Sequence, residues 1–167
     1  TSLGNTVKGL NRDVTIRDIV STYIYPNTLK TLCVTRAQLK CALERSAEYF
    51  AIDADGKLKV SESFLAPIEQ HFNYDYFSGI EAAFDIRRSV GDRVVSIKYK
   101  GEELSGDKLL TLCMNNYRAS GAGGYDIYRQ CQTVRELPTE IAELIIAYVD
   151  KHRNITVDKH KWLNVIY

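Results

Sequence analysis

The chain has 167 residues, which is enough for one ordinary domain with a sizeable core. Its 22 basic and 21 acidic residues give a formal net charge of +1, so it lacks the strong positive field that follows a nucleic-acid backbone, and binding to a nucleic-acid polymer is disfavoured. No apolar run approaches the length that spans a bilayer, which disfavours a membrane-spanning segment.

The first predicted elements are a helix and a strand joined by a stiff connector. Residues 15–23, TIRDIVSTY, indicate a short helix with Thr15 as a candidate N-cap. Pro26 lacks an N–H and biases Tyr25 towards extended geometry, so the YPN stretch is expected to be stiff. Residues 28–34, TLKTLCV, alternate enough and are β-branched enough to predict a strand.

The clearest helix start lies in residues 35–50, TRAQLKCALERSAEYF. Thr35 and Gln38 form a capping-box pattern, and apolar residues recur at helical spacing as far as Phe50, so one face is expected to pack on a sheet. Residues 51–70 are polar and contain Asp-Gly and Pro, so little regular structure is expected there. The DADG stretch lacks the remaining ligands of an EF-hand loop, which favours a turn.

Strand patterns dominate the next part of the chain. They lie in residues 71–86, where an aromatic cluster leads into the strand, in residues 93–104, where a glycine turn follows, and in residues 108–116. The last of these strands delivers the chain to Tyr117. A sheet would fix this residue while the following loop exposes it.

The C-terminal part predicts a helix and a closing strand. Residues 137–154, LPTEIAELIIAYVDKHRN, predict the longest helix, with Pro138 at its start and apolar residues along one face. Residues 160–167 are expected to close as a short strand. Strands and helices alternate without a regular βαβ repeat, so the predicted fold is α+β, one mixed sandwich of sheet and helices over residues 1–167.

The stretch MNNYRASGAGGYDIY, residues 114–128, sets an aromatic residue against a glycine-rich loop. A phosphate-binding loop is one interpretation, because glycine lets a ligand approach backbone N–H groups closely. The loop lacks both the Gly-Lys-Ser/Thr of a P-loop and the spacing of a dinucleotide fingerprint, which favours a tight turn. Tyr117 beside a loop without bulk would also suit a flat slot for a planar ligand such as a nucleobase.

The sequence predicts neither a catalytic centre nor a metal site. The histidines, His71, His152 and His160, show no metal-ligand spacing. The cysteines, Cys33, Cys41, Cys113 and Cys131, show no C-x-x-C spacing, and Cys33 and Cys113 lie in strand-like runs where a small buried hydrophobe is the commoner role. No nucleophile motif such as G-x-S-x-G is present. The chain alone is therefore expected to be inactive.

Three segments together resemble the C-terminal domain of the bacterial 5′-nucleotidase family. They are DVTIRDIVSTYIYPNTLKTLCVTRAQLKCALERSA, the pair YDYFSGIEAAFDI and GDRVVSIKYKGEEL, and LLTLCMNNYRASGAGGYDIY. The resemblance is strongest to the 2′,3′-cyclic-nucleotide 2′-phosphodiesterase/3′-nucleotidase branch, because GAGGY carries Gly123 where the 5′-nucleotidase branch commonly carries an acid. It implies a domain that recognises nucleotides or nucleosides and needs no cofactor of its own.

The resemblance also implies the binding residues. Two tyrosines, Tyr25 and Tyr117, would clamp the base, and Asn27 would hydrogen bond to the base edge or ribose. Gly121 and Gly123 would let the ligand lie close to the backbone, and Asn73 would form a further wall.

The rest of the parent protein is implied in the same way. An N-terminal metallophosphoesterase domain, whose motifs this chain lacks, would hold two divalent metal ions and hydrolyse the phosphoester. The parent would be a bacterial extracytoplasmic enzyme that is periplasmic, secreted or held at the cell wall. Two alternatives stay open. The parent is a broad 5′-nucleotidase, or the domain is a non-catalytic structural or interaction module without a ligand slot.

Overall fold

The computed structural model describes residues 9–167 as an α+β fold in which helices lie between and beside three antiparallel or mixed sheets. The helices are α1 (Ile16–Thr22), α2 (Arg36–Ala47), α3 (Asn116–Ala119) and α4 (Ile141–His152). Short 3₁₀ turns are formed by η1 (Glu62–Phe64), η2 (His71–Asn73) and η3 (Asp126–Gln130). The predicted fold class is confirmed.

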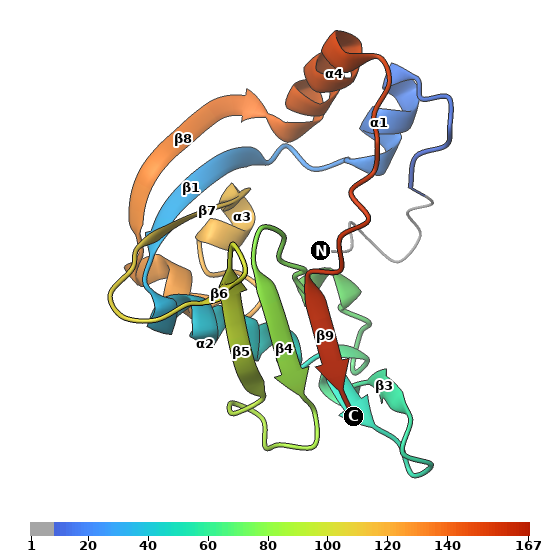
Figure 1. Cartoon of the computed structure of the whole chain (residues 1–167). Coiled ribbons are helices and arrows are strands. Elements are labelled where there is room, and N and C mark those ends of the chain that lie inside the picture. Colours follow the sequence, from blue (N-terminus) through green and yellow to red (C-terminus); the bar gives the residue numbers. More distant parts are fainter. Residues whose placement is uncertain (1–8) are drawn as a thin grey trace.

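The first sheet has three strands and positions the segments that contain Tyr25 and Tyr117. It has the order β7-β1-β8 and consists of β7 (Leu110–Asn115), β1 (Thr28–Val34) and β8 (Gln132–Glu140). Both pairings are antiparallel, and Leu29 near the start of β1 lies opposite Asn115 at the end of β7. The start of β1 and the end of β7 therefore lie at the same end of the sheet (Figure 1).

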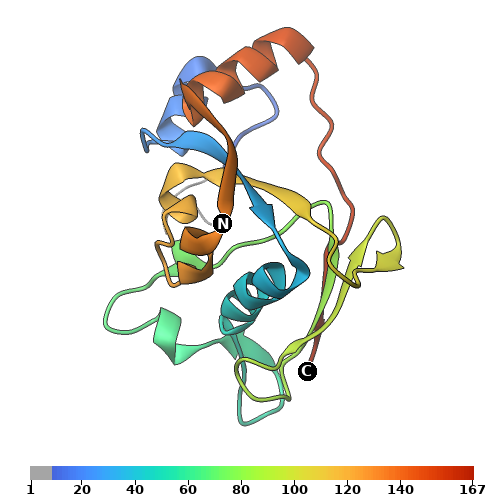
Figure 2. The ribbon, with the colours of Figure 1, turned by 90° about the vertical axis from the view of Figure 1, so that its left-hand side faces the viewer.

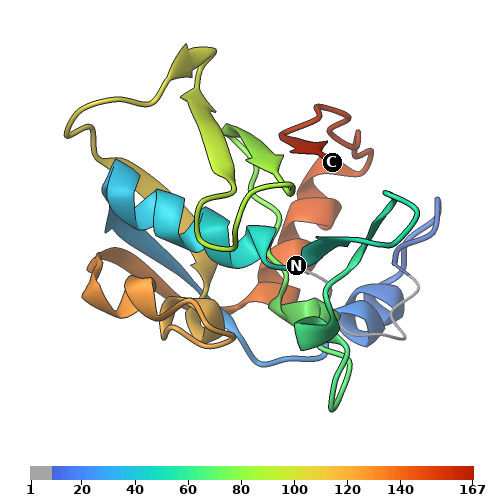
Figure 3. The same ribbon diagram turned by 90° about the horizontal axis from the view of Figure 1, so that it is seen from below.

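A second sheet has the order β6-β5-β4-β9. Its strands are β4 (Glu81–Asp85), β5 (Val94–Tyr99), β6 (Glu102–Glu103) and β9 (Leu163–Ile166). The β9 strand near the C-terminus pairs parallel with β4, while β5 pairs antiparallel with β4 and β6. Seen from below, α2 lies between this sheet and the β1 layer (Figure 3).

The core is one cluster that joins both large sheets to α2. Its members are apolar side chains that alternate along the strands or recur along the helix; they include Leu32, Val34, Leu39, Leu43, Phe84 and Ile97, each at most 2% exposed. The α2 helix starts as predicted, since the Thr35 hydroxyl accepts from the Gln38 N–H and the Gln38 amide oxygen accepts from the Thr35 N–H. Burial of the apolar face of α2 in this cluster fixes the orientation of the helix between the two large sheets.

Two sequence predictions are wrong: the end of the helix that starts at residue 36, and the lack of regular structure after it. The α2 helix ends at Ala47, and Phe50 starts β2 (Phe50–Ile52), which pairs with β3 (Leu58–Val60). Residues 51–70, which were expected to have little regular structure, therefore contain most of a β-hairpin. DADG forms the turn of this hairpin, where Asp53 Oδ1 accepts from the N–H groups of Asp55 and Lys57. Polar composition hid the hairpin because each strand is only three residues long.

The C-terminal helix also starts later than predicted. Leu137 and Pro138 belong to β8, and α4 begins at Ile141, so α4 is as long as α2 rather than longer. Pro138 does not open the helix, because it lies on an edge strand, where a residue without an N–H is tolerated. The α4 helix packs beside α1 at one end of the molecule (Figures 1 and 2). Every helix within residues 9–167 is too short or too polar to cross a membrane.

Candidate functional site

The fold brings Tyr25 and Tyr117 to the same end of one sheet. Tyr25 lies in the connection between α1 and β1, and Tyr117 lies in α3 directly after β7. The Asn116 side-chain oxygen accepts from the Thr28 N–H at 3.2 Å, which ties the two chain segments together. The side chains are exposed, with relative exposures of 45% for Tyr25 and 47% for Tyr117, so both rings are accessible to a ligand.

Tyr117 occupies a helical turn rather than the loop that was expected. The Asn115 side chain caps this turn by accepting from the Arg118 N–H at 2.7 Å, so the helix begins as soon as β7 ends. Asparagine is a favoured N-cap residue, so Asn115 was a sequence signal for this turn. The glycine-rich stretch that follows favoured a loop instead.

Asn27, the predicted polar contact to the ligand, is half-buried and already braces the connector. Its amide N–H donates to the Tyr23 hydroxyl at 3.3 Å, and its backbone carbonyl accepts from the Ile141 N–H at 2.8 Å. A contact of Asn27 with a ligand stays a prediction.

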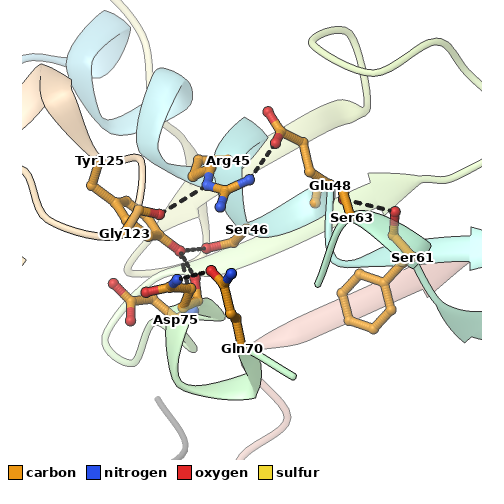
Figure 4. A network of polar contacts seen from close by, with 12 residues as sticks. Arg45, Ser46, Glu48, Ser61, Ser63, Gln70, Asp75, Gly123 and Tyr125 are labelled. Atoms are coloured by element: carbon orange, nitrogen blue, oxygen red, sulfur yellow. Dashed lines mark hydrogen bonds and ion pairs between the residues drawn. The ribbon is translucent and has the colours of Figure 1, made fainter. Parts of the chain in front are cut away.

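The glycine loop, residues 121–124, is organised around arginines. Three carbonyl oxygens in and beside it accept from arginine side chains: Ser120 from Arg129, Ala122 from Arg118 and Gly123 from Arg45. Figure 4 shows Arg45 reaching Gly123 on one side and Glu48 on the other. A phosphate cradle presents N–H groups to an anion, whereas this loop presents carbonyl oxygens to cations, so the geometry favours the turn interpretation.

The glycines leave room for those side chains. Gly121, Gly123 and Gly124 all have positive φ, of 87°, 75° and 88°. A Cβ atom at Gly121 would stand 2.7 Å from Arg129 Nε, and one at Gly123 would collide with Arg118 Nη1 and Asn73 Oδ1. The lack of side chains is thus required by the protein's own packing, and contacts of Gly121 and Gly123 with a ligand stay predictions.

Asn73 lies beneath this loop and is only 6% exposed. Its Nδ2 donates to Gln70 Oε1 at 2.7 Å, while its Oδ1 is buried and accepts no hydrogen bond within the described residues. The Tyr125 hydroxyl donates to the Asn73 carbonyl at 3.3 Å. The same hydroxyl lies 2.8 Å from Ser46 Oγ (Figure 4). Asn73 therefore has a bracing role, and its predicted contact with a ligand is untested.

Arg118 is the buried charge of this region, and no sequence signal marks it. Its side chain is 5% exposed and its Nε lies 2.7 Å from Asp75 Oδ2. Nothing in the spacing of NYRASGAGG distinguishes an inward arginine from an exposed one, because its partners Phe72 and Asp75 come from a distant segment.

A cleft with a volume of about 410 Å³ lies beside Arg118 and the outer edge of β7. Residues 75–78 form one wall and residues 111–115 the other. Cys113, expected to be buried, is exposed at this edge, because β7 is an outer strand whose alternate side chains face away from the core.

Two tyrosines are held in the neutral form: Tyr74, whose ring stacks on Tyr49, and Tyr125, which hydrogen bonds to residues 73 and 75. Burial raises the pKa of Tyr74 to about 12, and burial, assisted by the nearby Asp75 charge, raises the pKa of Tyr125 above its usual value. Such hydroxyls act as hydrogen-bond partners rather than as bases at neutral pH. Within residues 9–167, His, Cys, Asp and Glu side chains nowhere gather in a group of three or more that could hold a metal ion.

Comparison with known proteins gives a consistent result. The family described as "5'-nucleotidase, C-terminal domain" matches residues 2–130. A trifunctional nucleotide phosphoesterase of Bacillus subtilis is 23% identical over 155 residues, which cover 86% of this chain and 10% of that protein. A 2′,3′-cyclic-nucleotide 2′-phosphodiesterase/3′-nucleotidase of Haemophilus influenzae is 29% identical over 125 residues, which cover 65% of this chain and 18% of that protein.

Solved structures share the fold. A Staphylococcus aureus protein assigned as a 5′-nucleotidase, solved in complex with α-ketoglutarate, is 36% identical with a TM-score of 0.91 and covers 100% of this chain and 32% of its own. The NAD nucleotidase of Haemophilus influenzae is 19% identical with a TM-score of 0.70, covers 92% of this chain and 26% of its own, and shows the fold alone. The chain thus spans a third or less of the length of these relatives, and it belongs to the 5′-nucleotidase C-terminal domain family.

Proposed function

We propose that this chain is the nucleotide- or nucleoside-recognising domain of a larger phosphoester hydrolase, and that Tyr25 and Tyr117 hold the base between them. The observation that carries the proposal is the register of β1 and β7, which brings two exposed tyrosines from distant parts of the chain to one end of one sheet. Exposed aromatic rings on fixed supports are the usual platform for a base, because every base has a face that can stack.

The rest of the proposed parent supplies the chemistry. Two divalent metal ions in a separate N-terminal metallophosphoesterase domain would activate water and stabilise charge at phosphorus, while this domain positions the nucleoside. By itself, the chain is proposed to bind without hydrolysing. The parent is proposed to act outside the cytoplasm of a bacterium.

Two parent activities have support. The Haemophilus influenzae relative and a 26% identical relative from Yersinia enterocolitica favour a 2′,3′-cyclic-nucleotide 2′-phosphodiesterase/3′-nucleotidase. The 36% identity to the Staphylococcus aureus structure favours a 5′-nucleotidase. Rates of hydrolysis of 2′,3′-cyclic AMP and 5′-AMP by the full-length parent distinguish them.

The clamp is tested by calorimetric titration of the chain with adenosine. Stacking on one face of a base contributes roughly 1 to 3 kcal/mol, so Tyr117→Ala and Tyr25→Ala should each weaken binding by about tenfold to a hundredfold. Tyr117→Phe keeps the ring and should weaken binding far less, because at most one hydrogen bond, worth about 0.5 to 1.5 kcal/mol, is lost.

The matched control is Tyr148→Ala. Tyr148 is also a half-exposed tyrosine, at 54%, but it lies on α4. Its replacement should leave the affinity for adenosine unchanged. Equal affinity of wild type, Tyr25→Ala and Tyr117→Ala, with the fold intact by circular dichroism, would mean that these rings do not hold the base. No saturable binding of adenosine by the wild type would instead support a module without a ligand slot.

A further inference from the structure

Arg118 ties α3 and the glycine loop that follows it to residues 72–75, which are far away in the sequence. Its Nη2 donates to the Phe72 carbonyl at 2.9 Å, its Nη1 donates to the Ala122 carbonyl, and its Nε is paired with Asp75 at 2.7 Å. The guanidinium carbon also lies 4.4 Å from the centre of the Tyr125 ring. One side chain thus links α3, the glycine loop and the segment of residues 72–75.

These contacts require arginine rather than another cation. The planar guanidinium directs five N–H donors at fixed angles and can stack on an aromatic ring at the same time. A lysine ammonium would keep the charge but could not reach the Phe72 and Ala122 carbonyls and Asp75 in the same geometry. Because the residue is 4% exposed, a lost partner would not be replaced by bulk water.

The contacts of Arg118 also fix a helix that cannot fix itself. The α3 helix has four residues, and a single turn is unstable alone because its nucleation costs more backbone entropy than one hydrogen bond returns. Neighbouring residues of a helix point about 100° apart, so an inward Arg118 turns Tyr117 towards the surface. The Tyr117 ring lies 5.8 Å from the guanidinium carbon and is exposed.

We propose that Arg118 is the positioning residue of the site: by clasping residues 72–75 and the glycine loop, it holds α3 so that Tyr117 presents its ring to the base. This proposal rests on the proposed nucleoside-binding function. Arg118 itself has no contact with the ligand in this scheme, because its donors are used by Phe72, Ala122 and Asp75.

The test compares Arg118→Met with Arg93→Met in the intact chain. Arg93 is a matched control, because its Nη1 also donates to two backbone carbonyls, of Ala47 at 3.0 Å and Phe50 at 2.8 Å, but these belong neither to the glycine loop nor to residues 72–75. Arg118→Met should weaken adenosine binding by about three- to tenfold. Arg93→Met should lower the melting temperature without changing the affinity.

A double-mutant cycle separates positioning from general stability. If Arg118 acts through Tyr117, Arg118→Met should cost no further affinity in a chain that already carries Tyr117→Ala. An equal loss with and without the Tyr117→Ala change, or no loss in either case, overturns the proposal. Should Arg118→Met fail to fold, Asp75→Asn takes its place in the cycle, since it removes the carboxylate charge and keeps the volume.

A ligand-free readout keeps this proposal distinct from the proposed function. With 3-fluorotyrosine at position 117, the wild-type chain should give one sharp fluorine resonance, and Arg118→Met or Asp75→Asn should broaden or split it. An unchanged resonance overturns the positioning role even if adenosine binds. If wild type fails to bind adenosine but the resonance responds as expected, the nucleoside-binding function fails while Arg118 still positions Tyr117.

Discussion

The two tyrosines of the candidate site stand on supports of different kinds. Tyr25 lies on a connector stiffened mainly by its own sequence, with Pro26 restricting the backbone and Asn27 bonded to nearby Tyr23. A hydrogen bond from the distant Ile141 N–H to the Asn27 carbonyl adds to this local stiffness. Tyr117 lies on a short helix held by the long-range contacts of Arg118 with Phe72 and Asp75 and by the packed glycine loop. Two rings at one end of one sheet can therefore be fixed mainly by local stiffness in one case and mainly by tertiary packing in the other.

Gly123→Ala should cause the largest loss in the free energy of unfolding, because it disrupts the support of Tyr117 and leaves that of Tyr25 intact. Alanine at a φ of 75° is strained, and its Cβ would collide with Arg118 and Asn73, both buried. The free energy of unfolding should fall by about 3 to 4 kcal/mol, measured by urea denaturation.

Gly91→Ala is the control for backbone strain. Gly91 has a φ of 89°, but a Cβ there would meet nothing within 4 Å. Its substitution should cost only about 1 to 2 kcal/mol, the penalty of the left-handed conformation. Equal costs at Gly123 and Gly91 would mean that the glycine loop is not packed around Arg118.

Alkaline pH should also lower the free energy of unfolding, through a tyrosine of residues 72–75, the segment that Arg118 contacts. Burial raises the pKa of Tyr74, which lies between Phe72 and Asp75, from 10.0 to about 12. The unfolded chain then ionises at a lower pH than the folded one, so stability is full below pH 10 and is lost as the pH rises from 10 towards 12. Tyr74→Phe should reduce that loss by on the order of 2 kcal/mol, once partial exposure of the ring to solvent is allowed for.

The measurement is urea denaturation at a series of pH values from neutral to alkaline. Tyr125 and Tyr128 also have raised pKa values because of burial, so part of the alkaline loss should persist in Tyr74→Phe. Identical pH profiles for Tyr74→Phe and wild type would contradict the assignment of Tyr74 as a titrating group that folding removes from water.

Asn116→Ala should have the smallest effect, and it probes the link between the two supports. It removes the acceptor of the Thr28 N–H, at 3.2 Å, and should lower the free energy of unfolding by about 1 kcal/mol. Asn116→Asp keeps an acceptor oxygen and should restore most of that loss in the same urea experiment. If the aspartate variant is no more stable than the alanine variant, the hydrogen bond does not join the supports.

Local patterns predicted the elements that depend on neighbours in the chain. The capping box of Thr35 and Gln38 marked the start of α2, and the alternation of residues 28–34 predicted β1 with its observed bounds. Errors arose where context overrode pattern, as at Pro138, which fits an edge strand as well as it fits a helix start. Tyr117 was found through its position after a strand, although its helical turn was not.

The sequence by itself determined the start of α2, the stiff YPN connector, the end of β7 before Tyr117 and, through resemblance, the family. Only the tertiary structure decided how strands divide into sheets and which charges are buried. Arg118 reaches Phe72 across 46 positions and Arg45 reaches Gly123 across 78. Caps and turns depend on residues three or four positions apart and leave a pattern, whereas partners this distant leave none, because only the folded chain brings them together.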